Sequence, residues 1–227
     1  MNNIKIINGH IFTSKAQTLV NTINTVGVMG AGVALGFRLR YPDMYKRYKE
    51  LCKNKLIQIG KLWLFKASDR WILNFPTKEN WKDDSKIEYL EKGLQKFTNT
   101  YKEKNIDSIA FPILGSSHGK IPEEVSLNLM LKYLEQIDIP IEIYKLDLNA
   151  TDDVFIMLKN KLEDLTIKEI FSKTGIQKQY LKILVDNLNN VNIKNIVSLA
   201  EVDGIGLKTL EKVFDFIYER QSKEFYD

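Results

Sequence analysis

The sequence predicts an α/β sandwich with a mixed sheet, followed by a smaller part built only of helices. Two observations lead to this fold class. Strand-like and helix-like patterns alternate up to about residue 150, and only helix-like patterns follow. A length of 227 residues allows one domain of good size and a small one, and 44% hydrophobic residues suffice for a normal core. We therefore expect two domains, residues 1–149 and residues 150–227.

Six short apolar segments are predicted to form the strands of the sheet. The segment 108–114 reads SIAFPIL, which is apolar enough for a buried strand. The segments 60–67 and 70–76 are rich in aromatic and branched residues and are joined by the polar Ser68 and Asp69. In chain order, the predicted strands are 3–7, 18–23, 60–67, 70–76, 108–114 and 141–147.

Four amphipathic segments between these strands are predicted to be helices. In the longest of them, apolar residues recur at spacings of three and four, which places them on one face of a helix. The first helix is expected to end near Tyr41, because the residue before a proline disfavours helical backbone and Pro42 follows. The predicted helices are 30–39, 43–53, 85–104 and 123–136.

The pattern changes at the segment LNATDD, residues 148–153, after which no strand is predicted. Helical periodicity continues from there to the end of the sequence. A small all-α domain is therefore expected. Its predicted helical segments are 154–165, 166–175, 178–188, 196–202 and 208–221.

The composition excludes several kinds of site. The single cysteine, Cys52, rules out an internal disulfide, and two histidines argue against a His-based zinc site. Cys52 is expected to pack as a small hydrophobe on a helix, with a reactive thiol as the alternative. A net charge of +4 permits nucleic-acid binding without arguing for it. Neither a signal peptide nor a membrane span is apparent, so we expect a cytoplasmic protein with no membrane partner, metal or cofactor.

A glycine-rich turn after the second strand is the first candidate site. Glycines let the backbone approach an anion, and free N–H groups at the start of the next helix point at it. The alternative is a tight packing turn between strand and helix. Asn21 and Asn24 stand before this turn, where a carboxamide can fix a ribose hydroxyl; otherwise they are turn-forming asparagines. The glycines of the turn are Gly27, Gly30 and Gly32.

Three segments together carry a resemblance to the macrodomain family. VNTINTVGVMGAGVALGF (20–37) resembles the ADP-ribose-binding loop of macrodomains. FPILGSSHGKIP (111–122) is similar in position to the loop that wraps the phosphates and the distal ribose. NFPTKENWKDDSKIEYLEKGL (74–94) looks like the FPTK-x-x-W-x-x-x-S stretch of the DarG-type branch. The resemblance covers about residues 1–148 and implies a three-layer α/β/α sandwich with a mixed sheet.

The resemblance also implies an activity. DarG-type macrodomains are similar in removing ADP-ribose from DNA bases, which undoes the work of a partner toxin, DarT. The family's functional lysine carries over to Lys78 and its ribose-contacting asparagine to Asn24. The implied mechanism is a transient lysine–ribose adduct that water resolves; the alternative is that Lys78 is one more solvated lysine. The implied ADP-ribose contacts are Gly9, His10, Ile11, Asn24, Thr25, Val28, Met29, Gly30, Gly32, Val33, Ala34, Thr77, Trp81, Leu114, Gly115, Ser116, Ser117, His118, Gly119 and Lys120.

Several of these residues have open roles. Trp81 covers the sugar, stacks on a DNA base or caps the core. Thr77 holds a hydroxyl or caps a turn. His10 stands where many macrodomains carry an aspartate that reads the adenine amino group. The second loop lacks the aspartate of carboxylate-directed relatives, which argues against a protein-glutamate substrate and leaves open which group activates water. His118 is a candidate base, or else a loop histidine without catalytic duty.

The segment LAEVDGIGLKTLEKVF (199–214) resembles the helix–hairpin–helix motif. In that motif, a glycine turn and the following helix N-terminus present N–H groups to a DNA phosphate. The alternatives are protein contact, including contact with the toxin, and plain packing. The segment KTGIQKQYLKILVDNL further upstream is a possible degenerate second hairpin. The DNA-binding candidates are Gly204, Gly206, Lys208 and Lys212.

Three functions compete. The leading one is an antitoxin enzyme that removes ADP-ribose from DNA, with a DarT-like toxin, ADP-ribosylated DNA and free DNA as partners. The second is a macrodomain that binds ADP-ribose without cleaving it. The third is a hydrolase directed at ADP-ribosylated protein.

Overall fold

The computed structural model describes residues 3–220. The chain divides into two compact units, the first ending at Leu146 and the second beginning at Asp147. The boundary expected from the sequence lies after residue 149. The structure places it earlier because the carbonyl oxygens of Leu148 and Ala150 accept hydrogen bonds from the Asn195 side chain of the second unit, at 2.8 and 3.0 Å.

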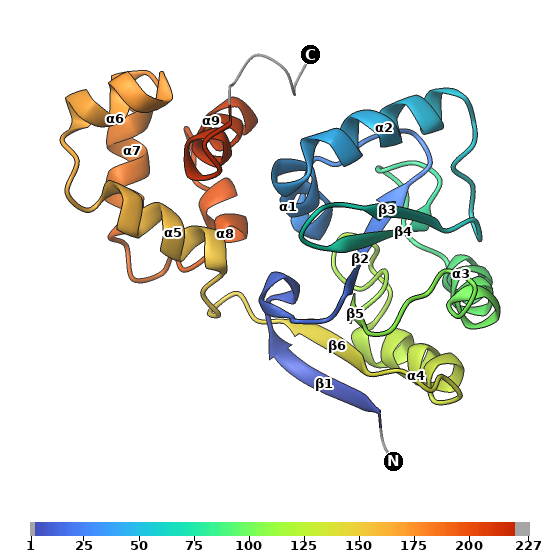
Figure 1. Ribbon diagram of the computed structural model, residues 1–227. Helices are drawn as coiled ribbons and strands as arrows, with labels where there is room; N and C mark the ends of the chain where they lie inside the picture. Colours follow the sequence, from blue (N-terminus) through green and yellow to red (C-terminus); the bar gives the residue numbers. More distant parts are fainter. Residues whose placement is uncertain (1–2, 221–227) are drawn as a thin grey trace. The chain divides into compact units, whose positions relative to one another are not determined.

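The first unit is built on one six-stranded sheet with the order β1-β6-β5-β2-β4-β3 (Figure 1). Only β3 and β4 pair in the antiparallel direction, and the other neighbours are parallel. The predicted mixed sheet is therefore confirmed. Because β2, β4 and β5 are parallel neighbours, their carboxyl ends meet at the same edge. The strands are β1 (Ile4–Gly9), β2 (Thr18–Asn24), β3 (Trp63–Lys66), β4 (Trp71–Lys78), β5 (Ile109–Pro112) and β6 (Ile141–Leu146).

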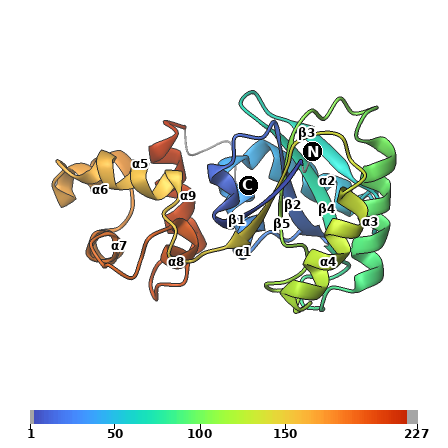
Figure 2. The ribbon, with the colours of Figure 1, turned by 90° about the horizontal axis from the view of Figure 1, so that it is seen from below.

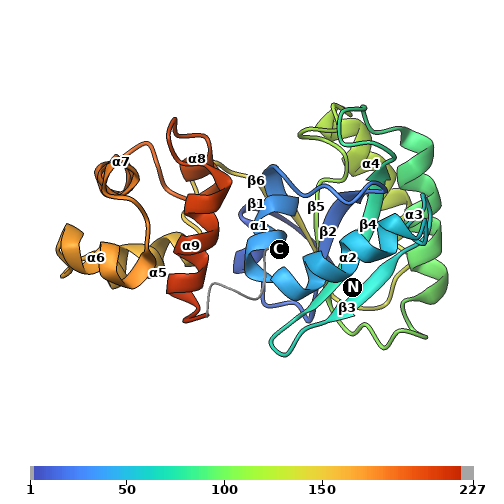
Figure 3. The same cartoon turned by 90° about the horizontal axis from the view of Figure 1, so that it is seen from above.

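Two apolar cores, one on each face of the sheet, make the unit a three-layer sandwich. One core contains Leu94 of α3 and Met130 of α4, and the other contains Phe37 of α1 and Tyr48 of α2. Helices α3 and α4 lie side by side (Figures 2 and 3). The expected α/β/α architecture is confirmed. The helices are α1 (Gly32–Arg40), α2 (Pro42–Lys53), α3 (Ile87–Thr100) and α4 (Glu123–Leu134), with a 3-10 turn η1 at Ile11–Thr13.

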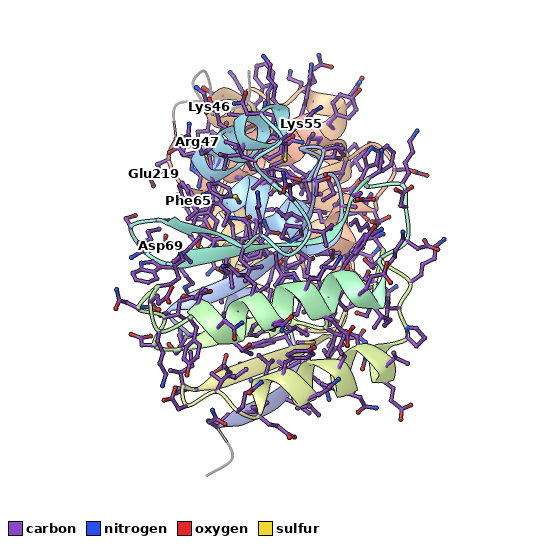
Figure 4. All side chains as sticks on the ribbon, turned by 90° about the vertical axis from the view of Figure 1, so that its right-hand side faces the viewer. Lys46, Arg47, Lys55, Phe65, Asp69 and Glu219 are labelled. Atoms are coloured by element: carbon purple, nitrogen blue, oxygen red, sulfur yellow. The ribbon has the colours of Figure 1, made fainter. Side chains whose placement is uncertain are left out.

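Helix α2 illustrates how the sequence pattern produces these layers. Its Met44 and Tyr48 are fully buried against the sheet. Lys46 and Arg47 face solvent on its other side (Figure 4). A helix that separates apolar and charged residues in this way is stabilised mainly by burying the apolar face.

The structure corrects two local expectations. Helix α1 begins at Gly32 rather than at residue 30, because the backbone of Ala31 before it is extended. The turn η1 was not predicted, since three residues are too few to show a helical period.

The described residues of the second unit form helices joined by turns, as predicted, and Gln221 of the predicted segment 208–221 lies outside them. Asp152 connects two of its helices. Its carboxylate accepts hydrogen bonds from the backbone N–H of Phe155 at 2.7 Å and from that of Ile196 at 2.9 Å. It therefore caps α5 and joins the start of α8 to it. The helices are α5 (Asp153–Leu162), α6 (Ile167–Thr174), α7 (Lys178–Leu188), α8 (Ile196–Ala200) and α9 (Leu207–Ile217). Within residues 3–220, no helix has the length and apolar character needed to cross a membrane.

Candidate functional site

The first loop of the candidate site, residues 25–31, is organised by Asn24 at the end of β2. The Asn24 side-chain oxygen accepts from the N–H groups of Val26 and Val28 at 3.1 and 3.2 Å, and its Nδ2 donates to the Val28 carbonyl at 2.6 Å. From α2, the Tyr48 hydroxyl donates to the Asn24 carbonyl at 2.7 Å. Asn24 thus holds the turn from a buried position.

Asn21 has a different place. It is fully buried in β2 and its Nδ2 donates to Oδ1 of Asn74 on β4 at 2.9 Å. The two asparagines face each other in the register of the parallel pair. Asn21 therefore ties two strands together and does not lie beside Asn24 at the edge where a ligand would bind.

The N-terminus of α1 follows directly on the first loop. Gly32 is its first residue, and the N-cap residue Ala31 makes no side-chain cap, so side chains of the N-cap leave the first N–H groups available. The imidazole of His118, from the second loop, lies directly over this point. A Cβ added to Gly32 would come 3.1 Å from its Cδ2.

The second loop, residues 113–122, connects β5 to α4 and is anchored at both ends. Ser126 of α4 donates to the Leu114 carbonyl at 2.6 Å, and the N–H of Ile121 donates to the Gly115 carbonyl at 3.0 Å. Gly115 adopts φ 66°, which favours glycine. Between the anchors, Ser117 and His118 are exposed. The loop is therefore a closed turn that presents its tip to solvent.

Lys78 stands where β4 ends and touches the second loop. It is half-buried, and its Nζ donates to the His118 carbonyl at 2.5 Å. Desolvation by burial lowers the pKa of Lys78, and the positive charge of Lys120 lowers it further, while Asp84 and Asp83 act in the opposite direction. This lysine is therefore not simply solvated. Its surroundings favour the free amine more than water does.

The segment after β4, residues 79–86, is fastened to the second loop at two points. The N–H of Ser85 donates to the Gly119 carbonyl at 3.0 Å, and the Lys120 ammonium lies 3.0 Å from an oxygen of Asp84. A Cβ at Gly119 would stand 2.3 Å from the Gly115 oxygen and 2.4 Å from the Ser85 hydroxyl. Only glycine fits there. The Ser85 hydroxyl itself is buried and makes no hydrogen bond within the described part of the chain.

The same segment also holds the first loop. Both the N–H and the hydroxyl of Thr25 donate to the Glu79 carbonyl, at 3.0 Å each. Trp81 follows and is 52% exposed, so the reading that it caps the core is wrong. Thr77 is buried within β4, so it is not a turn cap. Residues 79–86 therefore join the two loops and carry an exposed indole.

His10 lies at the end of β1 and is buried. Its ring stacks on Phe12 at 5.3 Å between centroids, and the ring of Phe12 packs against Gly36 of α1. Ile11 is buried in the same cluster, at the start of η1. His10 is thus part of the packing between η1 and α1, rather than an exposed reader of a base.

The remaining predicted ADP-ribose contacts lie in the first loop, in α1, in the second loop and at the end of β1. Val28 and Met29 belong to the first loop, where Met29 is fully buried and Gly30 exposed. Val33 and Ala34 form the first turn of α1. Ser116 donates to the Ile113 carbonyl at 3.1 Å within the second loop, and Gly9 ends β1.

The predicted DNA contacts lie in the second unit. Gly204 adopts φ 88° in the turn before α9, and Gly206 is the N-cap of that helix. Lys208 is exposed in its first turn, but the Lys212 ammonium donates to the Gly175 carbonyl at 2.5 Å. Close to Lys212 the unit has a cavity of about 560 Å³, lined by Lys161, Leu165, Lys173, Thr174, Lys212, Asp215, Phe216, Glu219 and Arg220.

Sequence reasoning missed three residues of the site. Tyr48 lies on α2, with no local signal that its hydroxyl reaches Asn24. Asp84 and Glu79 flank residues of the FPTK-x-x-W-x-x-x-S stretch but are not fixed positions of it. Their roles come from the folding of residues 79–86 between the two loops.

Comparisons with known proteins agree with this geometry. Residues 20–130 match the family model described as Macro domain. The chain is 40% identical over 123 residues to a DNA ADP-ribosyl glycohydrolase of Thermus aquaticus, covering 52% of this chain and 34% of that protein. Across the first three curated relatives, the chain spans 34–42% of their length.

Two solved structures extend the likeness. The macrodomain of Thermus aquaticus DarG superposes with a TM-score of 0.60 at 35% identity, covering 63% of this chain and 97% of that one. Thermosipho africanus DarTG in complex with ADP-ribose superposes with a TM-score of 0.62 at 35% identity, covering 67% of this chain and 43% of that one.

Proposed function

Because this chain belongs to the macro domain family, we propose that its first unit binds ADP-ribose between the two loops and removes it from a modified DNA base. One observation carries the proposal. Lys78 ends a strand beside both loops, its amine donates to the His118 carbonyl at 2.5 Å, and burial lowers its pKa. An amine that loses its proton more readily than in water therefore ends β4 next to the second loop, which supports its proposed role.

In this proposal, both loops contact the ADP-ribose. The start of α1, with Gly32 as its first residue, offers N–H groups to the diphosphate. Asn24, at the base of the first loop, contacts the distal ribose through its remaining N–H. The second loop covers the phosphates with its exposed tip at Ser117 and His118. In this proposal, C1 of the distal ribose faces Lys78.

The reaction then breaks an N-glycosidic bond. The free amine of Lys78 attacks C1, and the electron pair of the bond passes to the base nitrogen. The proton lost by the lysine nitrogen balances the proton gained by the departing base. Water adds to C1 of the adduct, the bond to lysine breaks, and ADP-ribose leaves. A lowered lysine pKa helps the first step because only the unprotonated amine is a nucleophile.

In this proposal, the Trp81 side chain contacts the DNA. It is 52% exposed on residues 79–86, beside Lys82, whose ammonium lies 5.3 Å from the indole centroid. An exposed indole is a stacking platform for a nucleobase next to the modified one. The adjacent lysine adds attraction for the phosphate backbone.

The proposed biological role depends on a toxin partner. We propose that the chain acts as an antitoxin to a DarT-like DNA ADP-ribosyltransferase in the cytoplasm. Co-expression tests this directly: a DarT-like transferase from the neighbouring reading frame should stop growth, and the wild-type chain should restore it. Restoration by a Lys78→Ala variant as well would point to physical blocking of the toxin instead of repair.

The second unit is proposed to hold DNA without reading its sequence. The turn at Gly204 leads into α9, whose N-cap Gly206 makes no side-chain cap, and Lys208 is exposed beside it. Lys208→Glu should therefore weaken binding of unmodified duplex, with a loss that shrinks at high salt. The matched control is Lys168→Glu, an exposed lysine on α6. Equal losses would mean general electrostatics, and toxin binding by this unit would then be tested.

A binding module without catalysis is the second candidate. The observation that favours it is the tip of the second loop, where residues 115–120 read GSSHGK and contain no carboxylate. Such a module would bind free ADP-ribose tightly and leave modified DNA intact. Turnover of modified DNA excludes it.

The deciding experiment uses an oligonucleotide with one ADP-ribose on a base. Wild type, Lys78→Ala and the control Lys104→Ala, an exposed lysine after α3, are compared for release of ADP-ribose. We expect release by wild type and Lys104→Ala, and a loss of at least a hundredfold with Lys78→Ala, as for loss of a nucleophile. Equal release by all three would remove Lys78 from the mechanism. No release by any, with ADP-ribose bound, would favour the binding module.

A further inference from the structure

The second loop approaches Lys78 without a carboxylate of its own. Its exposed tip carries Ser117, His118 and Lys120. The acids that raise the pKa of Lys78 come instead from residues 79–86, which leave β4 directly after Lys78. Asp84 and Asp83 both act on the pKa of Lys78, Asp84 more strongly. The acids that act on Lys78 thus follow it in its own segment, and none comes from the second loop.

Asp84 is bound to the loop by an ion pair. The Lys120 ammonium lies 3.0 Å from its Oδ1, although the side chains of Lys120 and Asp84 remain 73% and 57% exposed. Pairs this exposed contribute little to the free energy of folding. A purely stabilising role therefore explains little about why the pair stands here.

Lys120 is also held in an unusual backbone conformation. Its φ is 60°, in the left-handed region that residues with a Cβ rarely adopt. The neighbours maintain it: the N–H of Lys120 donates to the Ser117 carbonyl at 3.1 Å, and that of Ile121 to the Gly115 carbonyl at 3.0 Å. Strained residues that persist are concentrated at functional sites. The turn aims the Lys120 side chain at Asp84.

Three charged side chains act on the pKa of Lys78. Asp83 and Asp84 come from residues 79–86, and Lys120 comes from the second loop, which also contributes the His118 carbonyl. Glu79 follows Lys78 directly, but its carboxylate accepts from the Tyr89 hydroxyl at 3.0 Å. Two carboxylates and one ammonium group therefore act on the Lys78 amine. The ammonium of Lys120 forms an ion pair with one of the carboxylates, that of Asp84.

We propose that Asp84 and Lys120 are positioning residues for Lys78, rather than catalytic ones. Their ion pair places the Lys120 charge beside Asp84, on the loop whose His118 carbonyl accepts from the Lys78 amine. Their opposite charges balance each other at that amine and set how much of it is unprotonated. The inference rests on the proposed function of Lys78 as nucleophile.

Opposite charges predict opposite effects, which a merely structural pair does not produce. Lys120→Met removes a positive neighbour, so the pKa of Lys78 rises and the rise of kcat/KM with pH moves to higher pH. Asp84→Asn removes a negative neighbour and moves the same limb to lower pH. Each shift should be about half a pH unit. The double variant should lie near wild type, and Lys120→Arg should keep the wild-type profile.

The control is a second exposed ion pair of matched geometry. Lys102 and Asp138 lie 2.8 Å apart with side chains 69% and 62% exposed, beyond the far end of α3. Asp138→Asn should leave the pH profile in place. Measurements at ionic strength below about 50 mM avoid screening of the effect.

A readout without turnover separates this inference from the proposed function. The chain is labelled with ¹³C-lysine, the Cε signal of Lys78 is assigned with Lys78→Ala, and its chemical shift is followed against pH. We expect the two single variants to move the titration in opposite directions. Shifts in the same direction, or none, would overturn the inference. Titrations that move as expected in a protein that releases no ADP-ribose would leave the inference standing and reject the proposed reaction.

Discussion

The imidazole of His118 lies against Gly32, the first residue of α1. A Cβ built on Gly32 would come 3.1 Å from Cδ2 and 3.3 Å from Nε2 of that ring. The tip of the second loop thus rests on the helix N-terminus that ends the first loop. The His118 ring therefore lies next to the first N–H groups of α1.

Gly32→Ala should weaken ADP-ribose binding about tenfold or more. Gly32 has φ 56°, and a Cβ there both costs about 1–2 kcal/mol and crowds the His118 ring. Gly30→Ala is the matched control, because the nearest atom to its added Cβ, Val28 Cγ1, is 3.9 Å away. Isothermal titration with ADP-ribose measures both affinities. Equal losses would mean that the loop tolerates no Cβ at all and that His118 is irrelevant.

Gly119→Ala should impair the site while Ser85→Ala is tolerated. The Cβ at Gly119 would overlap the Gly115 carbonyl at 2.3 Å, so the second loop must shift. The Ser85 hydroxyl is buried without a hydrogen bond in the described structure, so its removal deletes an unsatisfied group and should leave the free energy of unfolding unchanged or raise it by about 1 kcal/mol. Thermal unfolding and ADP-ribose release check both. A large destabilisation by Ser85→Ala would show that this hydroxyl has a partner in solution.

Tyr48→Phe should lower the free energy of unfolding by about 1–2 kcal/mol and weaken ADP-ribose binding. Its hydroxyl donates to the Asn24 carbonyl at 2.7 Å and approaches Oδ1 at 3.0 Å, and both are buried. Burial raises the pKa of Tyr48, so the hydroxyl stays protonated and donating throughout the accessible pH range. Tyr45→Phe is the control, since its hydroxyl lies 3.5 Å from the Gly27 carbonyl. The idea fails if the two variants behave alike in chemical denaturation.

Asp152→Ala should destabilise the helical unit by about 2–4 kcal/mol without changing ADP-ribose affinity. Its buried carboxylate accepts from Phe155 at 2.7 Å and from Ile196 at 2.9 Å, and both N–H groups lose that partner. Asp186→Ala, an exposed change on α7, is the comparison. Hydrogen exchange read separately for α5 and α8 measures the effect. Unchanged protection in these helices would contradict it.

Cys52 should react slowly with iodoacetamide in the native protein. Burial raises the pKa of its thiol, so at pH 8 less of it is the reactive thiolate than in an exposed cysteine. It is the chain's single cysteine, so mass spectrometry gives an unambiguous rate. Denaturant should speed the reaction. A native rate equal to that of an unfolded peptide would restore the reactive-thiol alternative.

The order of helices and strands could largely be predicted from local sequence patterns. All six predicted strands exist, and the predicted helix 178–188 coincides with α7 (Lys178–Leu188). The α/β class and the helical tail were predicted correctly for the same reason. Periods of two and of three to four residues are properties of neighbours in sequence, and burying one face of each element makes them visible.

Side-chain partners were less predictable, because they depend on strand order and register. Asn21 and Asn24 look alike in the sequence, yet one is buried against Asn74 and the other organises the first loop. Trp81 is exposed although tryptophans are more often covered. Nothing local distinguishes these cases.

The sequence by itself determined the fold class, the two loops and the lysine on which the proposed chemistry depends. Only the tertiary structure decided what surrounds that lysine. The His118 carbonyl reaches Lys78 across 40 positions of the chain, and Lys120 reaches Asp84 by the same approach of loop to strand end. Such contacts arise because β2, β4 and β5 are neighbours that end at one edge of the sheet. Their pairing is set by the packing of the whole core, which no short segment encodes.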